Sequence, residues 1–288
     1  MEGRRYYSVR KGINQGELDF DLNLLKRAFN SIYSDFNNKY YFQKAFGYKC
    51  VDDGTVPGTT GSDIEIFFLR KLLKPNLWPI GKMIDNYSED DLFDVIELLY
   101  DLIAKPLVGY EHKWNNCGWH YQTFDDETGQ SEFRKEINEI LRSYREGYEL
   151  SASGEILLIG DKGLEDLHQE EVPEFDPDNI DERLKQAVLK FRRYKSSDEE
   201  KREAVRTLAD ILEYLRDKLG KHGTYLLSKD EDALFNIANN FGIRHHNLRQ
   251  QTNYDATTWL PWMFYIYLAS IHLSIRLIQR ANSEADED

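Results

Sequence analysis

Apolar residues recur at every third or fourth position along much of the chain, and this spacing predicts amphipathic helices. Between residues 17 and 46 the pattern predicts one or two helices, with Gly47 as the stop. After a Gly/Thr/Pro-rich interruption, further helices are predicted at residues 64–73, which Pro75 closes, at 89–104 and at 130–145. Ser62 or Asp63 caps the first of these, and Ser88 caps the second, with Asp91 completing a capping box.

One segment has the features of a β-hairpin. Residues 147–160, GYELSASGEILLIG, predict two short strands joined by a Ser-Gly turn. This is the only strong β signal in the chain. The aromatic stretch WNNCGWHYQTFD at 114–125 is interpreted as an irregular segment.

An acidic stretch with two prolines, residues 168–181, marks the expected domain boundary. Beyond it, helices are predicted at 181–194, 198–219, 228–242 and 259–280, and their short connections suggest an up-and-down bundle. The predicted fold class is mainly α, with a helical N-terminal domain that carries the small β-hairpin and a C-terminal four-helix bundle. The expected domains are 1–172 and 176–282, followed by an acidic tail at 283–288.

The net charge of -14 argues against a long polyanion as partner, but the charge is unevenly distributed. Residues 1–175 carry 20 Lys+Arg against 32 Asp+Glu, whereas residues 176–288 carry 17 against 19. RNA therefore remains a candidate partner of the second domain. The chain has two cysteines far apart and an amino terminus without an apolar run, so a cytoplasmic location is expected.

The segment from Ala256 to Ile275 contains no acidic residue, lysine or arginine and is long enough to cross a bilayer. The one-sided apolar stripes of the preceding helices, however, need a partner that covers them. A central buried helix is therefore expected, with no membrane association.

The polar segment FGIRHHNLRQQTNYD, residues 241–255, separates the last two predicted helices. RNA cleavage without a metal needs a general base, a general acid and a cation near the phosphate. Histidine titrates near neutrality, and arginine holds phosphate through two donors. The candidate catalytic residues are Arg244, His245 and His246, and the candidate substrate-binding residues are Asn247, Arg249 and Gln250. A solvated polar connection is the alternative interpretation.

This helical segment, with an arginine and a polar residue ahead of a long apolar last helix, resembles the HEPN superfamily. Residues 119–158 resemble the N-terminal module of AbiJ-type abortive-infection proteins. The resemblance implies a phage-defence ribonuclease that uses no cofactor and forms a homodimer through the C-terminal bundle.

The sequence also departs from the family pattern, in which a histidine follows the arginine and its polar neighbour after four to six positions. The corresponding positions here are Arg249, Gln250 and Gln251. The alternative is therefore a catalytically inactive module that dimerises or binds a partner protein.

Zinc binding is a second chemistry that the residue types allow. Cys117 and His120, together with His112 and the distant Cys50, offer ligand types that suit zinc. The spacing His-x4-Cys-x2-His matches no strong zinc pattern, so a structural role in an aromatic loop is favoured and no metal is predicted.

Overall fold

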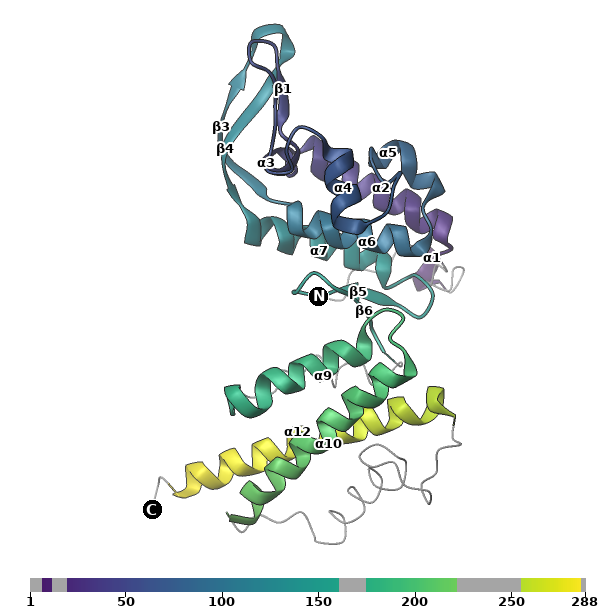
Figure 1. The fold of residues 1–288 in the computed structure, drawn as a ribbon, viewed down its shortest axis with the longest axis vertical. Coiled ribbons are helices and arrows are strands. Elements are labelled where there is room, and N and C mark those ends of the chain that lie inside the picture. The colour runs from purple at the N-terminus through teal and green to yellow at the C-terminus, as the bar shows by residue number, and fades with distance from the viewer. Residues whose placement is uncertain (1–6, 12–19, 161–174, 222–254, 286–288) are drawn as a thin grey trace. The chain divides into compact units, whose positions relative to one another are not determined.

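The computed structural model describes residues 7–11, 20–160, 175–221 and 255–285. The chain divides into two compact units, Met1–Ile159 and Gly160–Asp288, and each is considered by itself. The described residues are mainly helical and include three small antiparallel hairpins (Figure 1), which confirms the mainly-α class at that level. The boundary predicted between residues 172 and 176 adjoins residues outside this description and stays a prediction.

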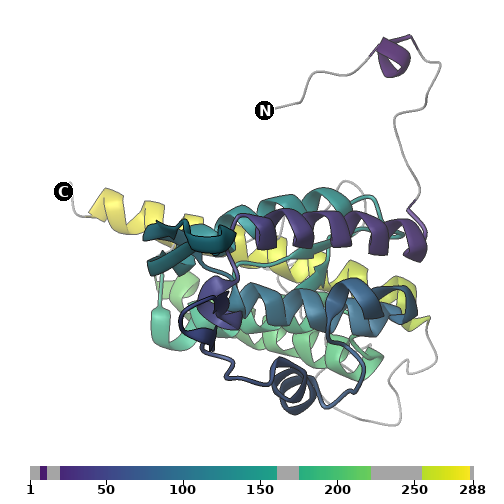
Figure 2. The same cartoon turned by 90° about the horizontal axis from the view of Figure 1, so that it is seen from above.

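Three helices form the core of the first unit: α2 (Leu22–Asn38), α6 (Glu89–Leu102) and α7 (Asp126–Leu141). Helices α2 and α7 run side by side, as Figure 2 shows from above. The ring of Phe36 on α2 meets that of Phe133 on α7 edge-on at 5.4 Å. Each large apolar side chain buried in this way contributes about 1.5–3 kcal/mol. The fully buried side chains of the three helices keep the predicted three-or-four spacing: Leu25, Phe29, Leu92, Val95, Ile96, Leu99, Phe133, Ile137 and Leu141.

The remaining helices of this unit are short: α1 (Tyr7–Arg10), α3 (Gln43–Phe46), α4 (Ile64–Leu72), α5 (Ile80–Met83) and the 3₁₀ turn η1 (Ile84–Asn86). The segment 17–46 therefore contains two helices in its described part, and Gly47 ends the second at a φ of 74°. Asp63 caps α4 by accepting a 3.0 Å hydrogen bond from the backbone N–H of Ile66. The capping box of Ser88 and Asp91 at the start of α6 is confirmed.

Three hairpins complete the first unit. They pair β1 (Tyr48–Cys50) with β2 (Gly54–Val56), β3 (Lys105–His112) with β4 (Gly118–Asp125), and β5 (Tyr148–Leu150) with β6 (Ile156–Leu158). The third lies where the sequence predicts a hairpin. The first two were not predicted, and β4 shows that the interpretation of residues 114–125 as irregular was wrong for residues 118–125.

Helix α7 begins at Asp126, four positions earlier than predicted. Asp125 caps it by accepting a hydrogen bond from the backbone N–H of Thr128 at 3.0 Å. Gly129 lies in the first turn, where a Cβ would come within 2.7–2.9 Å of the backbone of Ala104 and Lys105. A glycine, which normally weakens a helix, is needed here for close packing.

The second unit contains the turn η3 (Pro177–Asp181) and the helices α9 (Glu182–Arg192), α10 (Asp198–Lys221) and α12 (Ala256–Ala285). Helix α10 packs against both others, and Phe191 of α9 stacks on Phe264 of α12 at 4.0 Å. Helices α10 and α12 run in the same direction in Figure 1, so the end of α10 and the start of α12 lie at opposite ends of the pair. The helix predicted at 228–242 lies outside the described residues, and the four-helix arrangement stays a prediction.

Helix α12 provides much of the core of this unit, as expected of a buried helix. Its fully buried residues include Leu260, Met263, Phe264, Tyr267, Ile271 and Ile275. It begins three residues before the predicted start, because Asp255 accepts hydrogen bonds from the backbone N–H and hydroxyl of Thr257. Pro261 consequently lies in its second turn. Of the helices described, none combines the length and apolar character needed to cross a membrane.

Candidate metal centre

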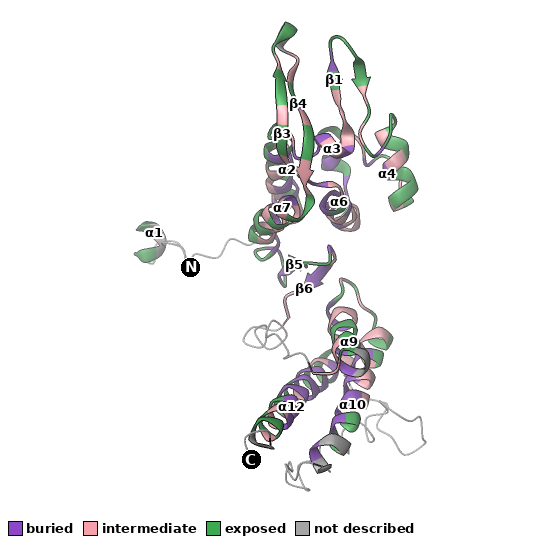
Figure 3. Cartoon of the chain, turned by 90° about the vertical axis from the view of Figure 1, so that its left-hand side faces the viewer, coloured by how far each residue is buried: buried purple, intermediate pink, exposed green. Residues whose placement is uncertain are grey.

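Strands β3 and β4 form a two-stranded ribbon that extends from the helical core of the first unit (Figure 1). His112 pairs with Gly118 and Tyr110 with His120, so the two histidines lie on the same face near the tip. The tip is closed by the turn η2 (Trp114–Asn116) and by Gly118 at a φ of 98°. Most of the ribbon is exposed or half-buried (Figure 3).

The hairpin of β1 and β2 lies beside the tip of this ribbon (Figure 3). Cys50 is the last residue of β1 and pairs with Gly54, whose φ of 71° closes the tight turn. The side chain of Gln43, from α3, joins the neighbouring ribbon by donating to the carbonyl of Trp119 at 2.8 Å and accepting from the N–H of Tyr121 at 2.7 Å. These two hydrogen bonds fix β4 relative to α3 and therefore to β1, which directly follows it.

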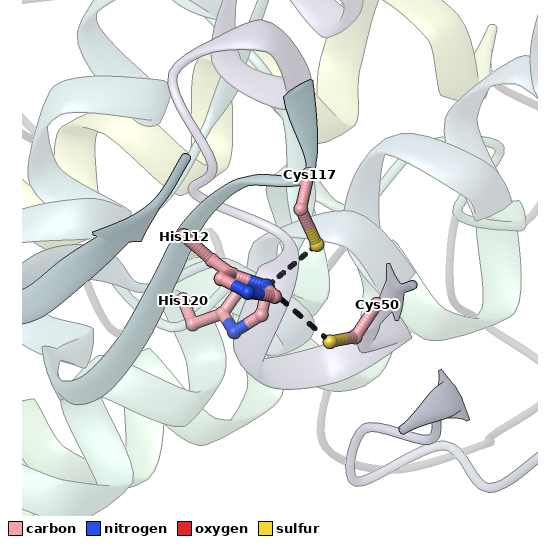
Figure 4. A group of neighbouring side chains, drawn as sticks. All are labelled: Cys50, His112, Cys117 and His120. Atoms are coloured by element: carbon pink, nitrogen blue, oxygen red, sulfur yellow. Dashed lines mark hydrogen bonds between the residues drawn. The ribbon is translucent and has the colours of Figure 1, made fainter. Parts of the chain in front are cut away.

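Four side chains meet where the hairpin and the ribbon adjoin. The ligand atoms of Cys50, His112, Cys117 and His120 all lie within 4.8 Å of one another (Figure 4). The Sγ of Cys50 is 3.7 Å from Nδ1 of His112, and the Sγ of Cys117 is 3.2 Å from Nε2 of His120. A tetrahedral zinc ion with ordinary bond lengths places its ligand atoms about 3.3–3.8 Å apart. The cluster therefore needs only small adjustments to hold zinc.

Each imidazole has one nitrogen directed to the cluster and the other directed to a polar partner outside it. Nε2 of His112 lies 3.2 Å from a carboxylate oxygen of Asp52, and Nδ1 of His120 lies 3.3 Å from the hydroxyl of Tyr110. Metal-bound histidines usually donate their second ring N–H to such a partner, which fixes the tautomer and the orientation of the ring. The carboxylate partner of His112 reproduces the carboxylate–histidine–metal arrangement.

The cluster is largely withdrawn from water. Cys50 is 6% exposed and His120 is 2% exposed, while His112 and Cys117 are half-buried. The ring of Tyr48 covers His120 at a centroid distance of 4.1 Å. Burial raises the pKa of the Cys117 thiol, the neighbouring Cys50 thiol raises this pKa as well, and a hydrogen bond with the Val51 backbone opposes the change.

The donor set suits zinc better than other common cations. Two thiolates balance the charge of a divalent ion, and sulfur with imidazole nitrogen is the donor set of Cys₂His₂ structural zinc sites. Calcium and magnesium require oxygen ligands. Because four protein ligands fill a tetrahedral shell and leave no place for water or substrate, the arrangement suits a structural ion.

The residues predicted for RNA cleavage lie outside the described part of the chain: Arg244, His245, His246, Asn247, Arg249 and Gln250. The structure brings together instead the four residues for which the sequence favoured a purely structural role. Three of them, His112, Cys117 and His120, were close in the sequence and gave a usable signal. The fourth, Cys50, lies 62 residues before His112, and its contribution depends on the fold.

Comparison of the chain with family models, with curated proteins and with solved structures gives no significant match. The resemblance to HEPN and AbiJ-type proteins therefore stays a prediction.

Proposed function

We propose that the first unit is a zinc-binding module in which one ion joins the β3–β4 ribbon to the β1–β2 hairpin. The ligands are Cys50, His112, Cys117 and His120. The observation that carries the proposal is their convergence within 4.8 Å from two separate hairpins. The outer partners of both imidazoles support it further, because side-chain packing alone does not require them.

The function of this ion is to hold an exposed ribbon in one position. Isolated two-stranded hairpins are at best marginally stable in water. The ribbon buries little apolar surface near its tip, since Tyr110, Trp114 and Trp119 are all exposed. A closed four-ligand site supplies the cross-link that a hydrophobic core would supply elsewhere.

The direct test is the metal content of the full chain, purified without chelator and measured by inductively coupled plasma mass spectrometry. We expect one zinc per chain in the wild type. The absence of stoichiometric metal, before and after reconstitution with zinc under reducing conditions, would reject the proposal.

A matched pair of variants tests the outer partner. Asp52 bonds to His112, whereas Asp53 is its neighbour in the same turn and makes no such bond among the described contacts. Loss of an outer partner lowers metal affinity about 10–100-fold, and the exposure of Asp52 favours the lower end. We therefore expect D52N to weaken zinc binding about tenfold and D53N to leave it unchanged, in competition titrations with a chromophoric chelator. Equal effects of the two variants would exclude a specific role for Asp52.

As a second candidate function we propose that the C-terminal unit cleaves RNA, acting as a cytoplasmic phage-defence effector. Support comes from the sequence, where Arg244, His245 and His246 stand together in a polar segment, and from the resemblance to HEPN proteins. In this proposal Arg244 stabilises the phosphate, and a histidine acts as general base or acid. Asn247, Arg249 and Gln250 bind the substrate, and two chains form a dimer through the helical bundle.

This second function is tested with zinc-loaded protein and single-stranded RNA in a buffer without free divalent cations. We expect cleavage by the wild type and its loss in the double variant H245A/H246A, with H222A as a histidine control outside the cluster. Cleavage that persists in the double variant would remove the assignment. A dimer that cleaves no RNA but co-purifies stoichiometrically with another protein would favour the non-catalytic alternative.

A further inference from the structure

The two cysteines of the proposed zinc site are also the only two in the chain. Both are reduced in the structure, and their sulfur atoms lie within 4.8 Å of each other. Cys117 is half-buried and therefore partly open to solvent, whereas Cys50 is buried. An oxidant therefore meets one thiolate first and has the second thiolate within reach as a resolving group.

We propose that this centre responds to hydroperoxides by forming a Cys50–Cys117 disulfide and releasing its zinc. The inference rests on the proposed zinc site and adds a mode of regulation to it. The inference follows from the pairing of a half-buried cysteine with a buried one. The cluster holds no third thiol that could compete for the disulfide.

The reaction has two steps. The Cys117 thiolate attacks the O–O bond of hydrogen peroxide, an S–O bond forms, and hydroxide leaves. The sulfur of Cys50 then attacks that sulfenic acid, an S–S bond forms, the S–O bond breaks, and a second hydroxide leaves. Two protons convert the two hydroxides to water. Overall, the two thiolates lose two electrons and one peroxide molecule gains them. Zinc leaves because only two neutral imidazoles remain to bind it.

The disulfide requires the sulfur atoms to approach to about 2.05 Å. Cys50 ends β1, and Cys117 lies between the turn η2 and β4, so both lie where a strand ends and the backbone can adjust. The oxidised chain then remains cross-linked between hairpin and ribbon, while His112 and His120 lose their metal. Only the reduced, metal-free chain loses the cross-link altogether.

The test treats the zinc-loaded full chain with hydrogen peroxide and follows zinc with a chromophoric chelator. We expect release of one zinc per chain, loss of both free thiols, and an intact mass lower by two hydrogen atoms. Peptide mapping without reductant should recover residues 50 and 117 in one cross-linked species. Dithiothreitol followed by zinc should restore the original metal content.

The variant C117H serves as the matched control, because it offers one thiolate and three imidazoles and has no second thiol for a disulfide. It should bind zinc and release it at least roughly tenfold more slowly under the same peroxide. If C117H does not bind zinc, the peptide map of the wild type decides the question alone.

The outcomes separate the two proposals. A wild-type chain that never binds zinc contradicts the proposed function. A chain that binds zinc and retains it under peroxide overturns the inference and leaves the zinc site standing. Zinc release with added oxygen atoms in place of the disulfide also overturns the inference, since it shows over-oxidation and no pairing of the thiols.

Discussion

The substitution C50S is the sharpest test of what zinc contributes to stability. Cys50 is 6% exposed and provides the only proposed ligand from outside the ribbon. Serine preserves the size of the side chain but removes the thiolate, so the remaining ligands all lie at the tip of β3 and β4. The metal then no longer joins the hairpin to the ribbon.

The magnitude follows from binding linkage. Zinc at a thousand times its Kd stabilises the native state by about 4.1 kcal/mol. Loss of an outer partner lowers metal affinity by up to about a hundredfold, and loss of a direct ligand should lower zinc affinity by at least that much. At the same zinc concentration about 1.4 kcal/mol would remain, a loss of about 2.7 kcal/mol. In a unit of this size that loss lowers Tm by about 5–11 °C.

This loss should reach the helical core, because the ligand-bearing strands are attached directly to it. Strand β4 ends at Asp125, and α7 begins at the next residue. The N–H of Ala104, just before β3, donates to the carbonyl of Tyr41 at 3.0 Å, and Lys105 forms an ion pair with Glu132 on α7. Disorder at the tip therefore weakens contacts that also hold α7 against the N-terminal helices.

The assay is thermal unfolding followed by circular dichroism, with added zinc and, separately, with a strong chelator. Wild type and C50S should differ by the amount above in zinc and by less than about 1 kcal/mol in chelator. Equal values of Tm in zinc, or a wild-type Tm that does not change with chelator, would show that zinc bound through Cys50 does not stabilise this unit.

Three further substitutions test the surrounding structure. Q43A removes both hydrogen bonds between α3 and β4 and should cost about 1–3 kcal/mol in chemical denaturation, with weaker zinc binding as a second readout. Burial raises the pKa of Asp91, but the hydrogen bonds from Ser88 and the ion pair with Lys74 outweigh this effect and lower it overall. The pKa of Asp91 in the native state thus lies below its pKa in the unfolded state. The stabilisation that its charge provides at neutral pH is therefore lost as the pH falls through the native pKa. D91N should be less stable than the wild type at pH 7, by about 1 kcal/mol, and should match the wild type in acid. Burial raises the pKa of Glu97, and acidic neighbours add to this effect, although a hydrogen bond from the backbone N–H of Ile156 opposes it. The charge of Glu97 therefore destabilises the fold at neutral pH. E97Q, which keeps an oxygen acceptor for Ile156, should raise Tm at pH 7 by roughly one or two degrees, and this advantage should disappear below about pH 4.

The helices were predictable because each buries one stripe of side chains. Leu25 and Phe29 on α2, and Ile137 and Leu141 on α7, follow the spacing that places them on one face. Local chemistry also determined where helices begin, as Ser88 and Asp63 show. These signals are contained in short stretches of sequence, so they can be recognised without knowledge of the fold.

The β3–β4 ribbon was not predictable, because it buries no continuous stripe of side chains. Its residues show no apolar and polar alternation, because neither face of the ribbon lies against a core along its whole length. Tyr110 and Trp119 are exposed on opposite faces, while His120, which pairs with Tyr110 across the ribbon, is buried. The spacing of apolar and polar residues indicates which face of an element is buried. It cannot indicate a strand whose position depends on a few side-chain contacts.

All four candidate ligands can be named from the sequence, but their convergence cannot be inferred from it, because Cys50 is remote from the other three along the chain. His112, Cys117 and His120 fit no common zinc spacing, since they belong to the two strands and the tip of one ribbon. The two histidines are eight residues apart in the sequence, and strand pairing brings them close together across the ribbon. Cys50 belongs to the group through the fold, in which the side chain of Gln43 joins β4 to the segment that leads into β1.

The position of the four candidate ligands gives a physical reason for the proposed metal site. The helices of the first unit have their own core, whereas the four candidate ligands belong to the end of β1 and to the strands and tip of the β3–β4 ribbon. There, too few apolar side chains are buried to repay the conformational entropy of ordering two hairpins. In the proposed site zinc bonds would replace that missing burial, and a disulfide between the same cysteines would replace the zinc. The order of the ribbon thus depends on metal and thiol chemistry, whereas the order of the helices depends on packing.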